Sequence, residues 1–300
     1  MNAKVIEQVT ILFMIMAVGV FARKKGILTD AVKKGLTELI LNITMPLMIF
    51  GSFNQQFSSQ LLVRAGQILL VSAAIHLLSY YLGALLFRRF PADQVSVLRY
   101  ITVISNAGFM GYPVLDALYG QQGIFYASFY TIPFNIAMLS LGVLLFSKQK
   151  STGVAKQILL HPAILAVGLG LIPFLFSLQL PAVISRPVNL LGNMTTPLSM
   201  LVIGAMIADT KLNGLFERSA LYGSLIRLLV VPLLTLVSLK VFGMPDEIVG
   251  ISVVLTAMPA GAMTAIMAGK YDANPLFASK CVFVSTLLSL GTIPLVLMLI

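Results

Sequence analysis

Two short stretches inside apolar segments hold the residue types best suited to binding chemistry. They are SNAGFMGYPVLD, residues 105–116, and LTAMPAGAMTA, residues 255–265. Proline has no N–H, its ring clashes with the preceding helical turn, and it disfavours helical geometry in the residue before it. Glycine adds backbone freedom beside it. We therefore expect Pro113 and Pro259, which lie 146 residues apart, to break two helices within a membrane.

A broken helix presents backbone groups that can bind ions. The N–H groups that begin a half-helix favour an anion, and freed carbonyl groups favour a cation or a donor. The Asn106 amide can donate to a carboxylate or cap freed carbonyls, while Tyr112 and Met258, expected in extended geometry, can line a pocket or simply pack. The candidate binding residues at the two breaks are Ser105, Asn106, Gly111, Tyr112, Pro113, Met258, Pro259 and Gly261.

Ionisable residues within the apolar segments are few, and a charge inside a membrane indicates a functional site by default. Arg227 is a further candidate binding residue: it can attract anions in an inward-facing vestibule, or it can extend its charged end to the membrane interface. His76 can titrate near neutral pH, although simple hydrogen bonding also accounts for it. Neither break carries the paired acids of a proton–sodium exchanger. The sequence has no P-loop and no Cys/His cluster, so we expect no cofactor and no metal.

The overall composition is that of an integral membrane protein. Hydrophobic residues make up 58% of the chain and charged residues 10%, against about 25% charged in a soluble domain. Apolar runs near the ~20 residues needed to cross the hydrocarbon core recur along the whole chain. We expect an all-α protein with ten transmembrane helices, at 7–22, 35–52, 61–87, 100–119, 124–146, 158–179, 190–208, 219–242, 248–268 and 281–299.

The net charge of +10 predicts a topology rather than a nucleic-acid partner. Fifteen of the 20 lysines and arginines fall in alternate loops, including RKKGILTDAVKK (23–34), RRFPADQVSVLR (88–99) and KQKSTGVAK (148–156). Lys211 and Lys280 belong to the same set, whereas only four basic residues lie near the other side. By the positive-inside rule, we expect the basic loops in the cytoplasm and both termini on the other side of the membrane. We expect this membrane to be a bacterial inner membrane.

A phrase written twice indicates an internal repeat. LNITMPLM contains Asn42, and GNMTTPLS contains Asn193, 151 residues later. Five helices per repeat is an odd number, so residues 151–300 must enter the membrane inverted relative to residues 1–150. The polar residues of the phrase can hydrogen-bond between helices, and its prolines can kink them. These residues are Asn42, Thr44, Pro46, Asn193, Thr195 and Pro197.

Three of these stretches resemble bacterial members of the auxin efflux carrier family, relatives of the plant PIN carriers. They are SNAGFMGYPVLDALYG (105–120), NITMPL (42–47) and the segment from Met258 to Ile300, MPAGAMTAIMAGKYDANPLFASKCVFVSTLLSLGTIPLVLMLI. The resemblance covers essentially the whole chain. It implies a fold shared with bile-acid sodium symporters, with a scaffold from helices 1, 2, 6 and 7 and a transport domain from helices 3–5 and 8–10 that moves as an elevator. It also implies small organic anions as substrates.

Together these patterns predict a secondary transporter of small organic anions, mono- or dicarboxylates or auxin-like acids, with the substrate at the crossing of helices 4 and 9. A sodium- or proton-coupled symporter or antiporter of the same fold, and a membrane-embedded ligand sensor, are alternatives. An enzyme is not expected, because acid-rich magnesium clusters are missing. The expected partners are the anion and the lipid bilayer, and pairing of two copies through the scaffold helices stays open.

Overall fold

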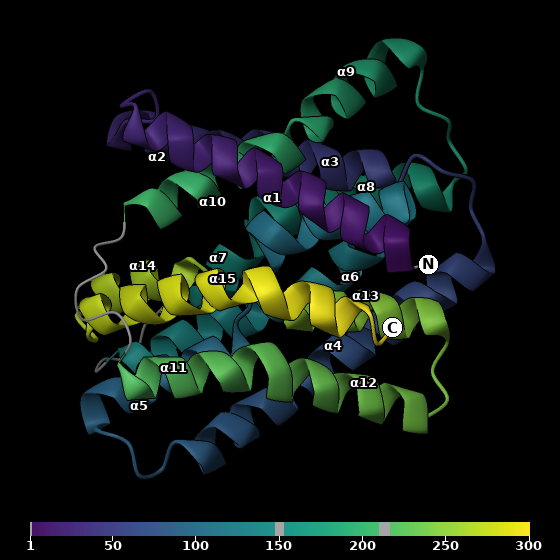
Figure 1. Cartoon of the computed structure of the whole chain (residues 1–300). Coiled ribbons are helices and arrows are strands. Elements are labelled where there is room, and N and C mark those ends of the chain that lie inside the picture. Colours follow the sequence, from purple (N-terminus) through teal and green to yellow (C-terminus); the bar gives the residue numbers. More distant parts are fainter. Residues whose placement is uncertain (1, 148–152, 210–216) are drawn as a thin grey trace. The chain divides into compact units, whose positions relative to one another are not determined.

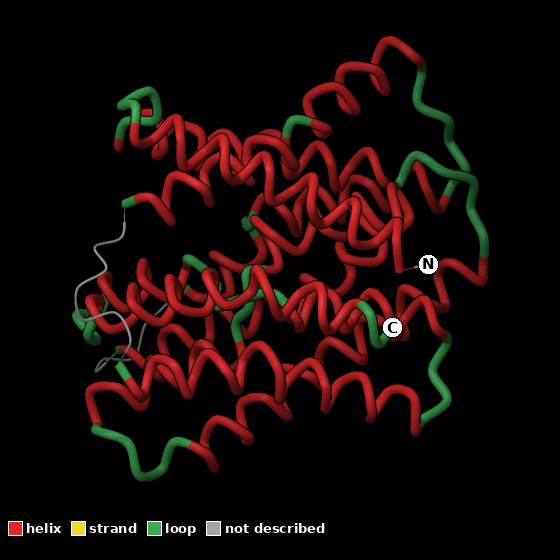
Figure 2. Tube along the Cα trace, in the orientation of Figure 1, coloured by secondary structure: helices red, strands yellow, loops and turns green. Residues whose placement is uncertain are grey.

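The computed structural model describes residues 2–147, 153–209 and 217–300 (Figures 1 and 2). Every regular element in these ranges is a helix, which confirms the predicted all-α class. The predicted loop residues Lys148, Lys150 and Lys211 lie outside the described residues. In the described part of the chain, six helical segments are long and apolar enough to cross a membrane: 30–52, 59–86, 107–146, 182–208, 218–241 and 275–297. The chain is therefore a multi-pass membrane protein.

Three short π-helical turns share one sequence cause. They are η1 (Ile40–Thr44), η2 (Ala107–Gly111) and η3 (Ile226–Val230). A proline follows two residues after each turn, at Pro46, Pro113 and Pro232, within the first two residues of α3 (Met45–Ser52), α6 (Tyr112–Phe146) and α12 (Val231–Val241). Because proline removes a donor and its ring crowds the carbonyl of the preceding turn, the backbone there widens by one residue.

The chain divides into two compact units, which are described separately. Unit 1 comprises residues 1–67, 108–129 and 159–210, and unit 2 comprises residues 68–107, 130–158 and 211–300. Helix α4 (Ser59–Leu86) begins in unit 1 and continues in unit 2. Helix α6 passes from unit 1 into unit 2 and contains one non-helical residue, Gly120 (φ 57°, ψ −147°).

Close backbone packing holds two helices of unit 1 together. The unit contains α1 (Asn2–Lys24), α2 (Asp30–Leu39), η1, α3, α8 (Pro162–Leu175), α9 (Ala182–Asn193) and α10 (Thr195–Ala208). Helix α1 lies along α10, and Figure 1 shows the two side by side. A Cβ on Gly204 would overlap the carbonyl oxygen of Met16, so only glycine permits this approach.

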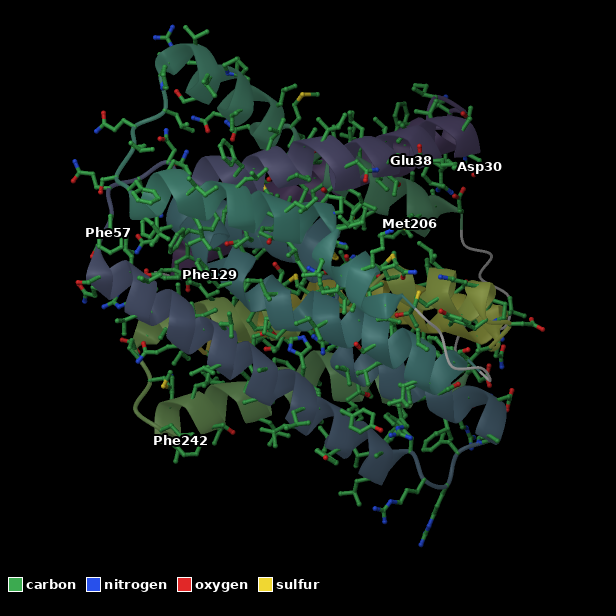
Figure 3. All side chains as sticks on the ribbon, turned by 180° about the vertical axis from the view of Figure 1, so that it is seen from behind. Asp30, Glu38, Phe57, Phe129, Met206 and Phe242 are labelled. Carbon is green, nitrogen blue, oxygen red and sulfur yellow. The ribbon has the colours of Figure 1, made fainter. Side chains whose placement is uncertain are left out.

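Aromatic side chains fill the interior of unit 1. The Phe53 ring lies 5.0 Å from Phe125 and 6.3 Å from Phe174, and Phe125 lies 5.2 Å from Phe129, between centroids. Phe57 extends the cluster, with its ring 5.5 Å from Phe174; Figure 3 labels Phe57 and Phe129. Edge-on and tilted rings at these separations attract one another beyond the effect of burial alone. This cluster fixes α3 against α8.

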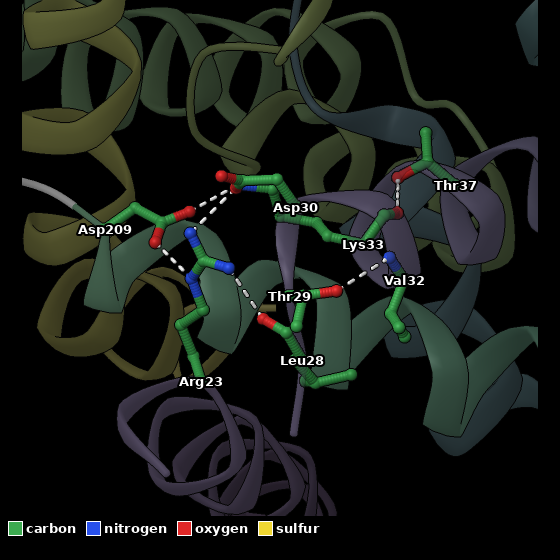
Figure 4. Close-up of polar contacts among 8 residues, drawn as sticks. All are labelled: Arg23, Leu28, Thr29, Asp30, Val32, Lys33, Thr37 and Asp209. Carbon is green, nitrogen blue, oxygen red and sulfur yellow. Dashed lines mark hydrogen bonds and ion pairs between the residues drawn. The ribbon is translucent and has the colours of Figure 1, made fainter. Parts of the chain in front are cut away.

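A group of charged side chains joins the ends of three unit 1 helices (Figure 4). Arg23 at the end of α1 binds Asp209, and its Nη2 donates to Asp30 of α2 at 2.7 Å. Lys33 of α2 binds Asp209 as well. The hydrogen bond that Arg23 donates to Asp209 is the largest cause that raises the pKa of Arg23. Two positive and two negative charges balance here, so the group ties the helices together and leaves no charge for a ligand.

The repeated phrase marks two helix junctions in unit 1. Its first copy spans the passage from η1 to α3, and its second spans the passage from α9 to α10. The hydrogen bonds expected between helices are not found in the described residues: Asn42 donates to Glu38 of its own helix, Asn193 is exposed, and the buried hydroxyls of Thr44 and Thr195 have no partner there. The repeated phrase therefore marks where one helical segment passes into the next.

Unit 2 is built around two helices of equal length. Helices α5 (Ala92–Val103) and α13 (Asp246–Ala257) each have 12 residues and follow a proline, Pro91 and Pro245. Both first turns contain acidic residues, whose negative charges stabilise the positive N-terminal ends of these helices. The other elements are α7 (Val154–Leu159), α11 (Arg218–Leu225), η3, α12, α14 (Met263–Lys270) and α15 (Pro275–Leu297). Helix α15 packs on α5, α11, α13 and α14.

Candidate binding site at two helix interruptions

The first interruption lies upstream of the proline that was expected to cause it. Helix α5 ends at Val103, Ile104 is extended (φ −99°, ψ 106°), and helical structure resumes at Ala107 with η2. Tyr112 is the first residue of α6, so its predicted extended geometry is wrong. Pro113 occupies the second position of that helix, directly after η2, and the wide turn accommodates the donor that this proline lacks.

The second interruption forms where the sequence predicts it. Helix α13 ends at Ala257, and Met258 is extended (φ −66°, ψ 146°) directly before Pro259. Helical structure returns at Met263 with α14. The steric effect of proline on its predecessor accounts for Met258, which is fully buried.

Backbone hydrogen bonds join the two interruptions inside unit 2. The Asn106 N–H donates to the Pro259 carbonyl at 2.7 Å, and the Gly261 N–H donates to the Ile104 carbonyl at 3.2 Å. A Cβ on residue 261 would lie 2.9 Å from the Ser105 carbonyl oxygen. Glycine is therefore required at this point for the two segments to meet.

These bonds change which N–H groups can serve a ligand. Besides Asn106 and Gly261, the Ala260 N–H donates to Ser285 Oγ of α15 at 3.1 Å. Three N–H groups at the interruptions thus bind the protein itself. These three groups are therefore not available to an anion.

The Asn106 side chain is buried next to the first interruption. Asn106 is 7% exposed, and no hydrogen bond engages its amide among the residues described. A buried amide without a partner loses the hydrogen bonds that water would give it. Ser105, also buried, precedes it. The Asn106 amide can therefore donate to a carboxylate, and the structure shows no freed carbonyl that it caps.

Arg227 connects the two helix ends. Its Nη1 donates to the Thr102 carbonyl at 2.9 Å, its Nη2 to the Thr256 carbonyl at 2.7 Å, and its Nε to the Met258 carbonyl at 3.2 Å. The residue is 1% exposed, so it does not extend to an interface. It belongs to η3, the π-helical turn caused by Pro232. Three backbone carbonyls therefore enclose the guanidinium, and a role of Arg227 in an inward-facing vestibule stays a prediction.

Three of the predicted site residues fall in unit 1. Gly111 ends η2, and Tyr112 and Pro113 begin α6, all three buried. One turn further on, the carboxylate of Asp116 accepts a hydrogen bond from Thr196 Oγ1 at 3.1 Å. The structure thus brings Ser105, Asn106, Arg227, Met258, Pro259 and Gly261 together in unit 2.

His76 is held by ordinary hydrogen bonds within unit 2. Its Nδ1 lies 2.6 Å from the Ser72 carbonyl oxygen, and Ser72 Oγ donates to the Tyr130 carbonyl at 2.7 Å. Its ring packs against Tyr130 and Phe134. These contacts fit the hydrogen-bonded interpretation of this histidine.

One polar residue of the interior was missed at the level of sequence. Asn135 on α6 is 4% exposed, and no described residue bonds its amide. It lies in an apolar run two residues after Pro133, and this proline inside the segment is the signal that could have pointed to it. No group of three or more His, Cys, Asp or Glu side chains in the described ranges could hold a metal ion.

The whole chain matches a known family. A family model described as membrane transport protein covers residues 4–297. The chain belongs to this family. It is similar to an uncharacterised transporter of Methanocaldococcus jannaschii, 25% identical over 300 residues and 96% of each chain. A putative malonate transporter of Rhizobium meliloti is 24% identical over 240 residues and 74% of each chain.

A plant relative confirms the resemblance to auxin efflux carriers. Auxin efflux carrier component 1 of Arabidopsis thaliana is 21% identical over 131 residues, which are 43% of this chain and 21% of the plant protein. The family and these relatives are transporters and not enzymes. The membrane transport protein described here therefore moves a solute across a bilayer.

Proposed function

We propose that this membrane transport protein is a secondary transporter of small organic anions, with mono- or dicarboxylates as substrates. Two relatives are named for carboxylic acids: one for malonate and one for auxin. The chain shares its family with both, at low identity. This shared family supports the substrate class, and the chemistry of unit 2 supports the site.

The observation that carries the proposal is a buried positive charge and a free amide at two interruptions that hydrogen-bond to each other. Arg227 binds the Met258 carbonyl, and the backbone of Asn106 binds the next carbonyl, that of Pro259. The guanidinium therefore raises the electrostatic potential close to the Asn106 amide in a medium that screens charge poorly. An entering carboxylate would accept from the amide and offset the arginine charge. Ser105, Met258 and Gly261 shape the same place, with Gly111, Tyr112 and Pro113 following along the chain.

We further propose an inverted repeat of ten helices, with α5 and α13 as equivalent half-helices. Both have 12 residues, or about 18 Å at 1.5 Å per residue, roughly half of a ~30 Å hydrocarbon core. Each would thus end near the middle of the membrane, as in transporters built from broken helices. Helices 1, 2, 6 and 7 of the ten then form the scaffold, and helices 3–5 and 8–10 form the transport domain that moves as an elevator. The loop charges favour a bacterial inner membrane with both termini outside.

The proposal predicts that Asn106→Ala weakens carboxylate binding by about 1–3 kcal/mol, because a carboxylate oxygen loses its donor. The measurement is the melting temperature of purified protein in detergent, titrated with malonate, malate and indole-acetate. Asn193→Ala is the matched control, since Asn193 is exposed and belongs to unit 1. That control should bind like the wild-type protein.

Uptake into proteoliposomes then separates transport from sensing. Labelled ligand should accumulate in liposomes that hold the wild-type protein and not in empty ones. Binding without uptake would point to a sensor. Equal affinities of Asn106→Ala and wild type would move the site away from the interruptions.

A further inference from the structure

The guanidinium of Arg227 occupies a cage of backbone oxygens. The three carbonyls come from two helix ends: Thr102 belongs to the last turn of α5, and Thr256 and Met258 lie at the end of α13. Nε, Nη1 and Nη2 each donate to one of them, over 2.7 to 3.2 Å. The last carbonyls of a helix lack helical partners and carry the negative end of its dipole. Two such ends therefore meet on one positive group.

Carbonyl oxygens at interrupted helices are ligands that free cations use. In transporters with broken helices, unwound carbonyls and half-helix C-termini coordinate sodium, and rings of carbonyls strip the water from potassium in channels. The site around Arg227 is likewise formed by carbonyl oxygens at interrupted helices, but the guanidinium of Arg227 occupies it in place of a free cation. A guanidinium offers donors in a plane and keeps its charge, so it satisfies the same oxygens.

The charge of Arg227 has no acidic partner in the described part of the chain. The carboxylates of unit 2 all lie outside the predicted membrane spans, at Asp93, Glu217, Asp246, Glu247 and Asp272. Its three hydrogen bonds go to neutral carbonyls. Burying an ion is costly unless its surroundings offset the lost hydration. A buried arginine without an acidic partner therefore suggests that the positive charge itself serves the protein.

We propose that Arg227 is a built-in cation that takes the place of a free coupling ion. It ties the end of α5 to the end of α13 and supplies the positive charge that an anionic substrate needs. Transport then requires no sodium, lithium or potassium, and removing the side chain uncovers a site for such an ion. This inference rests on the proposed function for the anion, but the cation site can be tested without one.

The test measures the melting temperature of purified protein in detergent, in chloride salts of choline, potassium, sodium and lithium at equal ionic strength. Wild-type protein and Arg227→Lys should melt at the same temperature in all four, because the site is filled. Arg227→Ala should melt lower in choline and rise by about 5 °C or more in at least one metal salt, saturably, as a bound ion stabilises the folded state. Arg99→Ala, another arginine of unit 2, should show no difference between salts.

Several outcomes would overturn the proposal. Saturable stabilisation of wild-type protein by one metal ion would mean that the site already binds a free cation. Equal melting of Arg227→Ala in choline and in every metal salt would mean that the carbonyls form no cation site. Since the proposal requires rescue, failure of both Arg227→Ala and Arg227→Gln to give monodisperse protein in every salt also counts against it.

Measurements on the same samples distinguish a failure of this inference from a failure of the proposed function. If Arg227→Ala gains no cation dependence while wild-type protein is stabilised by carboxylates, only the built-in cation is rejected. If wild-type protein ignores every carboxylate while Arg227→Ala gains a sodium or potassium response, the organic anion proposal fails and the cation site stands.

Discussion

The two units bury different chemistry although their sizes are similar. Among the buried polar or charged side chains of the described residues, 18 lie in unit 2 and five in unit 1. Unit 1 is filled by the rings around Phe53 and by the close approach of α1 and α10 at Gly204. Unit 2 holds Arg227 and Asn106 at interrupted backbone. Unit 1 is thus held mainly by apolar packing, whereas unit 2 buries most of the polar side chains, among which the proposed site lies.

The largest effect that separates the units should come from Phe53→Ala. Removing a fully buried ring from the aromatic cluster leaves a cavity and should cost about 3–5 kcal/mol of stability. Carboxylate affinity should stay near that of wild type, because Asn106 and Arg227 belong to unit 2. Melting temperature and ligand titration in detergent measure both quantities. Phe176→Ala, at a residue that is 73% exposed, is the control.

The comparison would break if Phe53→Ala lost binding in proportion to stability. Unit 1 would then contribute to carboxylate binding, and the role of its aromatic cluster would not be limited to packing.

A smaller effect, confined to unit 2, should follow from Pro259→Ala. Alanine restores an N–H and allows helical geometry at Met258, so α13 can continue and the bond from Asn106 to the residue 259 carbonyl is disturbed. We expect carboxylate affinity to fall at least tenfold, about 1.4 kcal/mol, with the protein still monodisperse. Pro245→Ala tests the same change at the start of α13, where a missing N–H costs little.

Tenfold weaker binding in Pro245→Ala as well would contradict this explanation, since it would show that any proline of α13 matters. Unchanged binding in Pro259→Ala would show that the interruption persists without its proline or holds no ligand.

The position of these interruptions shows how far the sequence alone can lead. Met258 and Pro259 were placed correctly because the effect of a proline on its neighbour is local. The break after α5 was expected at Pro113 but occurs at 104–106, because η2 absorbs the effect of that proline. The proline two residues after the turn is a signal for it, but the sequence alone does not show that a wide turn, rather than a break in the helix, accommodates this proline.

The partners of Arg227 could not be predicted at all. Thr102 lies 125 residues from it in the chain, and Thr256 lies 29 residues away. The sequence places an arginine in an apolar segment, which suggests an interface or a vestibule. Only the packing of η3 against α5 and α13 decides that carbonyls enclose it. The class of protein, by contrast, follows from composition, which needs no packing information.

The smallest effect is expected from Asp116→Asn in unit 1. The amide oxygen of asparagine can still accept from Thr196, so the hydrogen bond survives without the charge. Uptake of carboxylate into proteoliposomes should stay within about threefold of wild type, with the same response to acidic and neutral buffers. If a monodisperse Asp116→Asn protein showed no uptake, Asp116 would instead act as a titrating acid of unit 1 in the transport cycle.

The π-helical turns also limit what a helical wheel can say about this protein. Each turn inserts one residue beyond the α-helical repeat, and one residue corresponds to about 100° of rotation. In the segment 218–241, the faces read before Ile226 therefore do not continue after Val230. A lipid-facing stripe drawn straight through η3 would be displaced by more than a quarter of the circumference. The same correction applies beyond η1 and η2, so faces should be assigned separately on either side of each turn.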